Sequence, residues 1–544
     1  MQWEILESQN YLKIMKEKHV SSLVAKVMDF RENISTEMVG LHSFNLFKDS
    51  KKVLERIEKA IVNQEKIVVY GDYDCDGMMA TTILVSAFEK RGVKVGYHIP
   101  NRFIDGYGLN VSRVEEIADK GYKLIITVDN GISALEACKR AKELGVDVII
   151  TDHHELPPIL PDAYAIIHTA LSPDYPFKAI SGGFVACKLA CALIGKQDAY
   201  LHCLAALTTI SDVMPMIDEN RTLVKGALRL LERNKYLSFE LLAGENTKYT
   251  TTTLGFIIAP KINAIGRLQD GLSPNQCITY FKHSGATSEK ERMFKLAFVT
   301  SCNKLNQERQ KLTNEQYKIA KSMIKQDIDA LCCVDANFHE GLIGLVAGKL
   351  TKEYYRPSFI MHENEDTGLI KGSARSIKGI HLYDLLQANA NVLKSYGGHA
   401  LAGGFSLQKE NYNEFVEGIN KFIKQNKDEK TFIETKDSIL VEETDLNLSN
   451  LHEFESLAPF GHGNEEPTFH LVLQQPSKIE TLSNNKHLKL TFNLRSGSFN
   501  CLWFNHGKDY ESIKHLNQFH LFGQLSINEF RNIETMQMIL EDLY

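Results

Sequence analysis

Three short apolar runs, each followed at once by acidic residues, constrain the fold of this chain more than any other feature. The runs at 67–70, 124–128 and 146–150 lead into the segments GDYDCDG, DNG and TDHHE, respectively. Short apolar runs bounded by turn residues are typical of buried parallel strands, and functional groups of open α/β sheets collect at the carboxyl ends of such strands. We therefore expect the acids and histidines to meet in one crevice. Clustered carboxylates and imidazoles require a cation, so the pattern predicts a divalent-metal site.

The composition predicts a multidomain enzyme of the cytoplasm. A chain of 544 residues is too long for one core and suggests three or four domains. No apolar stretch approaches the roughly 18 residues that span a bilayer, and the N-terminus lacks a basic segment followed by an apolar one, so no membrane partner is expected. The net charge of −6 argues against a uniformly basic surface, although it allows a local basic channel for nucleic acid.

The ten cysteines are scattered and contain no Cys-x-x-Cys pair. This spacing predicts reduced core residues rather than a disulfide or zinc framework.

Alternating strand and helix patterns predict an α/β fold with a doubly wound parallel sheet. Helices are expected at 79–90, 111–120 and 134–144, between strands at 93–99, 123–128 and 146–150. Residues 1–60 are expected to be mainly helical. The predicted organisation comprises this first domain with its N-terminal helical segment (1–275), a long linker helix (276–328), a second, smaller α/β domain (329–427) and a C-terminal OB-like β-barrel that binds nucleic acid (428–544).

The acid pattern fits phosphodiester hydrolysis by two cations. Such a pair, about 4 Å apart, generates hydroxide and neutralises charge in the transition state. Asp129, after the middle strand, is the candidate bridging ligand, with Asp74, Asp76 and His153 around it. Imidazole among carboxylates favours Mn²⁺, while Mg²⁺ is expected to support weaker activity. Two acids have competing interpretations: Asp72 suits a turn as well as a metal, and Asp152 is expected to orient its loop.

Several motifs resemble known proteins. GDYDCDG, the segments 128–131 and 152–154, and Ser211-Asp212 resemble the DHH phosphoesterase superfamily. Within it, FIDGYG (103–108), INAIGR (262–267), GSARS (372–376) and LAPFG (457–461) are similar to the RecJ family of bacterial exonucleases specific for single-stranded DNA. The resemblance runs from about residue 65 to the C-terminus. It implies hydrolysis from the 5′ end that releases mononucleotides during DNA repair and recombination.

The resemblance also implies roles for individual residues. Asp212 would be a further metal ligand, and His154 would face the scissile phosphate. Asn263 and Arg267 would be catalytic, with Arg267 near the scissile bond. Arg102, Ser373 and Arg375 would surround a terminal 5′-phosphate, and Gly398 and His399 would lie close to the phosphate backbone. Phe103 and Tyr107 would stack on bases or pack against their loop. The segment HTALSP at 168–173 departs from the family pattern, which usually has Asn-Pro there.

Three functions compete at this point. The first is a monomeric exonuclease acting on single-stranded DNA with a 5′ end, with a single-strand-binding protein and a helicase as partners. The second is a phosphodiesterase for short oligonucleotides, cyclic dinucleotides or polyphosphate, which would not need an OB-like domain. The third is a non-catalytic replication scaffold, which would not need the metal ligands.

Overall fold

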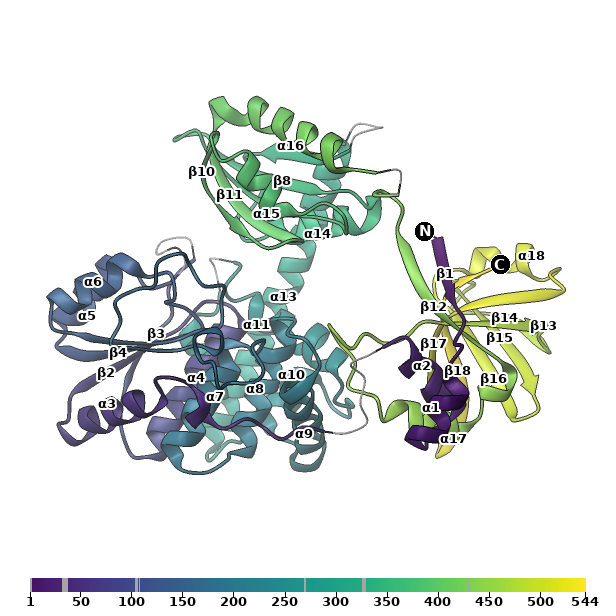
Figure 1. Ribbon diagram of the computed structural model, residues 1–544, viewed down its shortest axis with the longest axis horizontal. Coiled ribbons are helices and arrows are strands. Elements are labelled where there is room, and N and C mark those ends of the chain that lie inside the picture. The colour runs from purple at the N-terminus through teal and green to yellow at the C-terminus, as the bar shows by residue number, and fades with distance from the viewer. Residues whose placement is uncertain are drawn as a thin grey trace.

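The computed structural model describes residues 2–31, 38–102, 106, 108–268, 271–324, 329–428 and 430–544, which form three domains around separate cores (Figure 1). The stacking predicted for Phe103 and Tyr107 lies outside the described residues.

The first domain contains the predicted doubly wound sheet. Its strand order is β3-β2-β4-β5-β6, and all neighbouring strands are parallel. The strands are β2 (Lys66–Tyr70), β3 (Gly96–His98), β4 (Tyr122–Val128), β5 (Asp147–Thr151) and β6 (Ala165–Ile167). The chain moves from β2 outward to β3 and then returns to β4 on the other side, so the order reverses between β2 and β4. A crevice at the carboxyl ends of these two strands follows from that reversal.

Helices cover both faces of this sheet. Helices α5 (Val111–Asp119) and α6 (Leu135–Glu143) pack on one face, and α3 (Ser50–Val62), α4 (Cys75–Lys90) and α7 (Gly182–Ile194) lie on the other. Helix α7 and helix α8 (Ala199–Ser211) form a hairpin against α4. Further helices complete this layer: α9 (Asp218–Asn234), α10 (Leu237–Ala243), the π-helical turn at Thr253–Ile258, α11 (Ala259–Asn263) and α12 (Pro274–Phe281).

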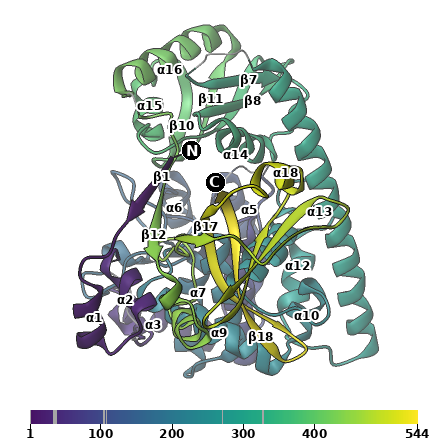
Figure 2. The same ribbon diagram turned by 90° about the vertical axis from the view of Figure 1, so that its right-hand side faces the viewer.

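The predicted linker helix is α13 (Glu289–Met323), which runs along one side of the molecule to the second domain (Figure 2). Its 35 residues span about 52 Å at 1.5 Å per residue. The second domain has a five-stranded sheet in the order β10-β11-β9-β8-β7, in which β7 and β8 are parallel and the other pairs are antiparallel. Its elements are β7 (Leu331–Asp335), α14 (Ile343–Tyr354), β8 (Ser358–Asn364), β9 (Leu369–Arg375), α15 (Leu382–Ala388), β10 (Leu393–Gly398), β11 (Ala402–Gln408) and α16 (Tyr412–Asn426).

The C-terminal domain is an eight-stranded β-structure in the order β1-β12-β13-β17-β18-β16-β15-β14. Its strands from the C-terminal part of the chain are β12 (Thr435–Val441), β13 (Phe469–Gln474), β14 (Lys478–Leu482), β15 (His487–Leu494), β16 (Gly497–Trp503), β17 (Gln518–Phe530) and β18 (Ile533–Leu543), with short helices α17 (Leu448–Glu455) and α18 (Tyr510–Ile513). Helix α9 contacts this domain, where the Arg221 guanidinium donates to the carbonyls of Ser456 and Leu457 at 3.1 Å.

The N-terminal segment differs from its prediction. Residues Gln2–Leu6 form a strand, β1, which pairs in parallel with β12, and α1 (Tyr11–Lys18) and α2 (Ser22–Asp29) follow it on the same domain. Apolar residues of α2 enter the C-terminal core, and Lys26 forms a buried 2.6 Å ion pair with Asp445. Residues 2–29 therefore complete the C-terminal domain rather than the first one. Local sequence patterns do not reveal a partner strand more than 400 residues away.

None of the helices in the described part of the chain has the length and apolarity required to cross a membrane.

Candidate metal centre and adjoining cavity

The three predicted strand ends meet at the carboxyl edge of the first sheet. Asp129 follows β4 between the segments after β2 and β5, and its backbone N–H donates to the Thr151 carbonyl at 3.0 Å. Its backbone has a positive φ of 62°, a conformation that Asp and Asn adopt more readily than most residues. The turn thus places the Asp129 carboxylate within the cluster.

His153 contacts three carboxylates at the centre of this cluster. Its Nε2 lies 3.1 Å from Asp129 Oδ1, 3.5 Å from Asp212 Oδ2 and 3.8 Å from Asp76 Oδ2. Asp212 comes from the end of α8, which explains how a residue distant in sequence joins the strand ends.

Asp129 also belongs to a second group, with Asp72 and Asp74. Their ligand atoms lie within 4.8 Å of one another, as do those of the neighbouring group formed by Asp76, His153 and Asp212. Asp74 additionally caps α4, accepting from the Gly77 N–H at 3.0 Å. Two adjacent groups of oxygen and nitrogen ligands, with Asp129 between them, match the donor set of a two-ion site.

The first turn of α7 holds Asp76 in place, a contact not anticipated from the sequence. Both carboxylate oxygens of Asp76 accept backbone N–H groups, from Gly182 at 2.9 Å and Gly183 at 2.7 Å. A Cβ atom on Gly182 would lie 2.3 Å from Asp129 Oδ1, so only glycine allows this approach. The Ser-Gly-Gly at 181–183, directly before the apolar segment at 184–193, was the available signal.

The electrostatics of the cluster also favour a cation. Burial, followed by repulsion from neighbouring acids, raises the pKa of Asp76 to about 7 and raises the pKa values of Asp72, Asp129 and Asp212 well above the usual range. These carboxylates therefore resist simultaneous ionisation by themselves, and divalent cations remove that penalty. The residues present fit such ions.

Asp152 orients the histidine pair, as the sequence predicts. Its Oδ1 accepts from the His153 N–H at 2.7 Å and lies 2.7 Å from His154 Nδ1, while Oδ2 accepts from the Ile132 N–H at 2.9 Å. Burial alone would lower the pKa of His154, but the contact with Asp152 outweighs it and raises that pKa to about 9. His153 behaves oppositely: burial and the charge of His154 lower its pKa to about 3.

The unusual segment at 168–173 supports the same loop. His168 Nε2 lies 2.8 Å from the His154 carbonyl, and its Nδ1 accepts from the Ala170 N–H at 3.1 Å. His168 thus stabilises the loop that contains His154. The departure of this segment from the family pattern did not by itself predict that contact.

Asn263 contacts the start of α4 within the first domain, whereas Arg267 contacts the second domain. Asn263 Oδ1 accepts from the Cys75 N–H at 2.8 Å, which gives Asn263 a positioning role at the start of α4 rather than a demonstrated catalytic contact. Arg267 donates to the Gly341 carbonyl at 3.2 Å and so links the first domain to the second. Burial, together with the charges of Arg102 and other arginines, lowers the Arg267 pKa to about 10.

Arg102, Ser373 and Arg375 line one cavity of about 770 Å³ between these domains, as their predicted common role requires. Arg375 Nη1 lies 3.3 Å from Ser373 Oγ. Tyr73, whose ring lies 5.2 Å from the Arg102 guanidinium, lines the same cavity. Because Tyr73 stands between Asp72 and Asp74, the cavity and the acid cluster share a wall.

The Gly-rich end of β10 lies across the domain boundary from the histidine loop. His399 Nδ1 lies 3.0 Å from Glu155 Oε1, and both side chains are exposed. Gly398 has a positive φ of 143° and lies where a Cβ would be 2.4 Å from the Ala402 carbonyl oxygen. The roles predicted for Gly398 and His399 toward a phosphate backbone remain predictions.

Comparison with known proteins identifies the family. Three family models match in chain order: the DHH family N-terminal domain at 66–210, the DHHA1 domain at 322–425 and the RecJ OB domain at 439–542. The single-stranded-DNA-specific exonuclease RecJ of Bacillus subtilis is 35% identical over all of this chain and 70% of that protein. The chain belongs to the RecJ family. The Haemophilus influenzae RecJ is 31% identical over 90% of each chain.

A solved RecJ structure agrees with this membership. The crystal structure of Thermus thermophilus RecJ in complex with Mn²⁺ has a TM-score of 0.84 and 26% identity to this chain, covering all of it and 79% of the Thermus chain. A corresponding Mg²⁺ complex is also similar, with a TM-score of 0.77 and 25% identity. This RecJ family member therefore has the expected α/β, linker and OB architecture, and its acid cluster fits the same two cations.

Replacing Gly182 with alanine should disrupt the RecJ metal centre sterically. The added methyl group would overlap the Asp129 carboxylate, and a displacement of about 1 Å in a catalytic group costs roughly 100-fold in rate. We expect kcat on single-stranded DNA to fall by about that factor. Gly226→Ala on α9, where the Cβ meets nothing within 4 Å, is the matched control and should retain wild-type kcat. Equal activity of both variants would contradict the steric role of Gly182.

Proposed function

We propose that this chain is a metal-dependent exonuclease that degrades single-stranded DNA from its 5′ end and releases mononucleotides during DNA repair and recombination. Membership of the RecJ family and the complete set of acids and histidines support hydrolysis. Cleavage from the 5′ end is supported mainly by the cavity lined with cationic side chains. Tyr73, which stands between Asp72 and Asp74, lines this cavity.

Asp129 would bridge two Mn²⁺ ions, with Asp72 and Asp74 on one side and Asp76, His153 and Asp212 on the other. When bound, the ions supply a hydroxide nucleophile near neutral pH and compensate negative charge on the phosphate, and Mg²⁺ would do so less effectively at a site that includes imidazole.

The chain's own residues position the strand around this centre. Asp152 fixes the His154 ring through Nδ1, and the oriented imidazole would face an oxygen of the scissile phosphate. Arg267, held between the domains by Gly341, supplies a cation toward the adjoining backbone. Asn263 keeps the GDYDCDG segment in register by accepting from Cys75.

The cavity suits a terminal 5′-phosphate. Arg102 and Arg375 offer guanidinium groups, and Ser373 offers a hydroxyl, which together match an anion that carries more charge than an internal phosphodiester. The 12-residue helix α14 begins at this cavity, where Ile343 and Gly344 form part of the lining, so its amide dipoles add to the positive potential. A strand bound there by its 5′ end passes the metal centre next.

The proposal extends to the setting of the reaction. We place the enzyme in the cytoplasm as a monomer, in agreement with its complete site in one chain. A nuclease that requires single strands needs an unwinding reaction to supply them, so a helicase and a single-strand-binding protein are the expected partners. The OB domain would hold DNA beyond the first nucleotides.

One assay tests the proposed activity. Single-stranded DNA, duplex DNA and a dinucleotide, each labelled at the 5′ end, are incubated with the full chain and Mn²⁺. We expect labelled mononucleotide to appear first from single-stranded DNA, and chelation by EDTA to abolish it. Preferential cleavage of the dinucleotide would favour the short-substrate phosphodiesterase, and no cleavage of any substrate would favour the scaffold.

Arg375→Ala should separate end recognition from chemistry. We expect the apparent KM for 5′-phosphorylated strands to rise by about tenfold, in line with loss of one charge-assisted contact, while kcat at saturating DNA and Mn²⁺ dependence stay near wild type. Steady-state kinetics on matched 5′-phosphate and 5′-hydroxyl strands measure this. Lys378→Ala, an exposed cation near the same strand but outside the cavity lining, is the control. An unchanged preference for the phosphorylated end would exclude the pocket.

A further inference from the structure

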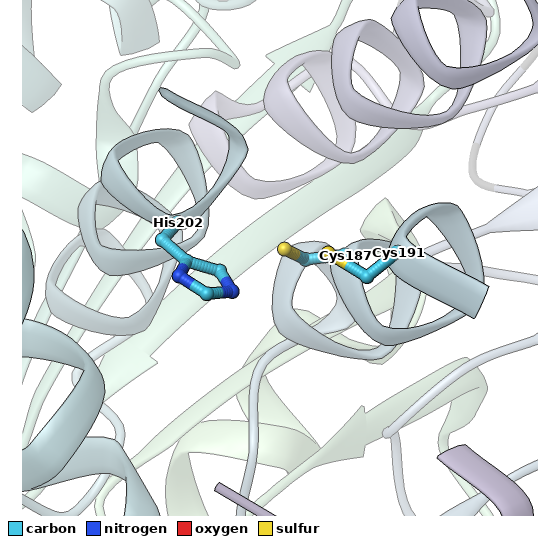
Figure 3. Close-up of side chains that lie close together, drawn as sticks. All are labelled: Cys187, Cys191 and His202. Carbon is cyan, nitrogen blue, oxygen red and sulfur yellow. The ribbon is translucent and has the colours of Figure 1, made fainter. Parts of the chain in front are cut away.

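Two cysteines and a histidine from neighbouring helices face one another (Figure 3). They lie at the end of the α7–α8 hairpin opposite the acid cluster. Cys187 and Cys191 lie one turn apart on α7, and His202 comes from α8. Their ligand atoms lie within 4.8 Å of one another. The opposite end of the same hairpin carries Gly182 and Asp212, so this group is separate from the catalytic centre.

The two thiols are buried at the wall of a cavity. Cys187 is 1% exposed and Cys191 is 6% exposed, while His202 is partly exposed. All three line a cavity of about 500 Å³. The cavity therefore adjoins all three side chains, which distinguishes this group from cysteines packed only in a core.

Contacts within the group favour a thiolate. A hydrogen bond from Cys187 to Cys191, followed by the contact with His202, lowers the pKa of Cys191 to about 5. The hydrogen bond with Cys191, followed by burial, raises the pKa of Cys187. Thiolates are the form in which cysteines bind metals.

Lys188 and His42, which line the cavity together with Lys196, have other partners. Lys188 Nζ lies 2.7 Å from Glu219 Oε2 and donates to the His42 carbonyl at 2.7 Å. His42 also lines the cavity, but its Nε2 lies 2.9 Å from Asp218 Oδ1. Gln197 Oε1 lies 2.8 Å from His202 Nε2 and orients that ring. The sulfur and imidazole atoms are thus the ligands that this end of the cavity offers to a cation.

We propose that Cys187, Cys191 and His202 form a second metal site, which binds one Zn²⁺ or a similar thiophilic divalent cation. Two sulfurs and one nitrogen provide three of four tetrahedral positions, and water from the cavity takes the fourth. Ligand atoms in such a site are about 3.3–3.8 Å apart, given bonds of about 2.0–2.3 Å. Because the ligand atoms already lie within 4.8 Å of one another, the group needs to contract by no more than about 1–1.5 Å. The bound ion would join α7 to α8 and stabilise the hairpin that carries Gly182 and Asp212 to the catalytic centre.

Cobalt provides a probe that distinguishes the two sites. The full chain is reduced, freed of metal and titrated with Co²⁺. A thiolate ligand produces intense charge-transfer absorption in the near ultraviolet, which the catalytic centre, with only oxygen and nitrogen ligands, does not produce. We expect this absorption to saturate at about one Co²⁺ per chain, to disappear on addition of Zn²⁺ and to persist in excess Mn²⁺.

Variants assign the signal to these residues. The double variant Cys187→Ala/Cys191→Ala should lose the absorption, while Cys138→Ala, which removes a buried thiol on α6, should keep it. Both should retain Mn²⁺-dependent cleavage of DNA. If circular dichroism shows the double variant to be unfolded, His202→Ala decides the question, because it alters a partly exposed side chain and should weaken Co²⁺ binding by about tenfold or more. Absence of the absorption in the wild type, or its persistence in the folded double variant, would overturn the proposal.

Discussion

Asp129→Asn should lower kcat by at least about 1,000-fold, because this carboxylate groups with Asp72 and Asp74 and also contacts His153 of the neighbouring group, so its loss would weaken both. Asparagine retains the size of the side chain and tolerates the positive φ of 62° at this position. The loss would therefore report on charge and ligation rather than on backbone strain. Single-turnover cleavage of 5′-phosphorylated DNA with saturating Mn²⁺ is the measurement, and Asp174→Asn, an exposed acid of the same domain, is the control.

The same variant should not lose stability without metal. Burial and neighbouring acids raise the pKa of Asp129 well above its unfolded value, so its ionised form costs folding free energy at pH values above the unfolded pKa. Neutralising it relieves that cost, and we expect the metal-free variant to unfold at the same temperature as wild type or higher. Mn²⁺ should then raise the midpoint temperature of thermal unfolding more for the wild type than for the variant. Retention of more than about a tenth of wild-type kcat would contradict the bridging role.

Removing the C-terminal domain should weaken binding to long single strands by about 10- to 100-fold and reduce its dependence on salt, while cleavage of short oligonucleotides changes by less than about threefold. The hairpin of β17 and β18 supports this role, because Phe530 and Ile533 are about two-thirds exposed and the Arg531 guanidinium lies 5.2 Å from the Phe530 ring. An exposed ring with an adjacent cation suits an unstacked base and its phosphate.

The structure determines how that truncation must be made. Deleting 430–544 alone would expose Leu23, Val24 and Val27, which are fully buried in the C-terminal core. A fragment of residues 39–428 removes both parts of that domain and leaves the other cores intact. Binding is measured by fluorescence anisotropy at several salt concentrations, with the full chain as reference. Equal losses on long and short substrates would show that the domain supports the catalytic core rather than binding DNA.

The sequence predicted the catalytic crevice well because parallel strands place their carboxyl ends together whatever the intervening chain does. Asp129 and His153 follow neighbouring strands, so their proximity required only the strand pattern. Asp212 follows a helix, whose packing no local pattern reveals, and its placement came from the family resemblance. The cavity residues Arg102 and Arg375 lie in different domains. Their common role was therefore predicted only from the family resemblance.

Other features depended on tertiary contacts that sequence patterns do not encode. The contact between Asp76 and the amides of Gly182 and Gly183 requires the α7 start to meet the β2 segment. Asn263 was predicted to be catalytic, and that role stays a prediction, but the acceptance by its Oδ1 of the Cys75 backbone N–H was not anticipated. The Cys187, Cys191 and His202 group combines two helices, and the absence of a Cys-x-x-Cys spacing concealed it.

The pairing of β1 with β12 has a consequence for synthesis. The ribosome makes Gln2–Leu6 long before their partner strand, which begins at Thr435. At about 5–20 residues per second, the N-terminal strand waits roughly 20–90 s for that partner. During this interval the apolar side chains of α2 are exposed on the nascent chain, while the first domain is already able to fold. Translation speed and chaperone access should therefore affect the yield of the C-terminal domain more than that of the catalytic core.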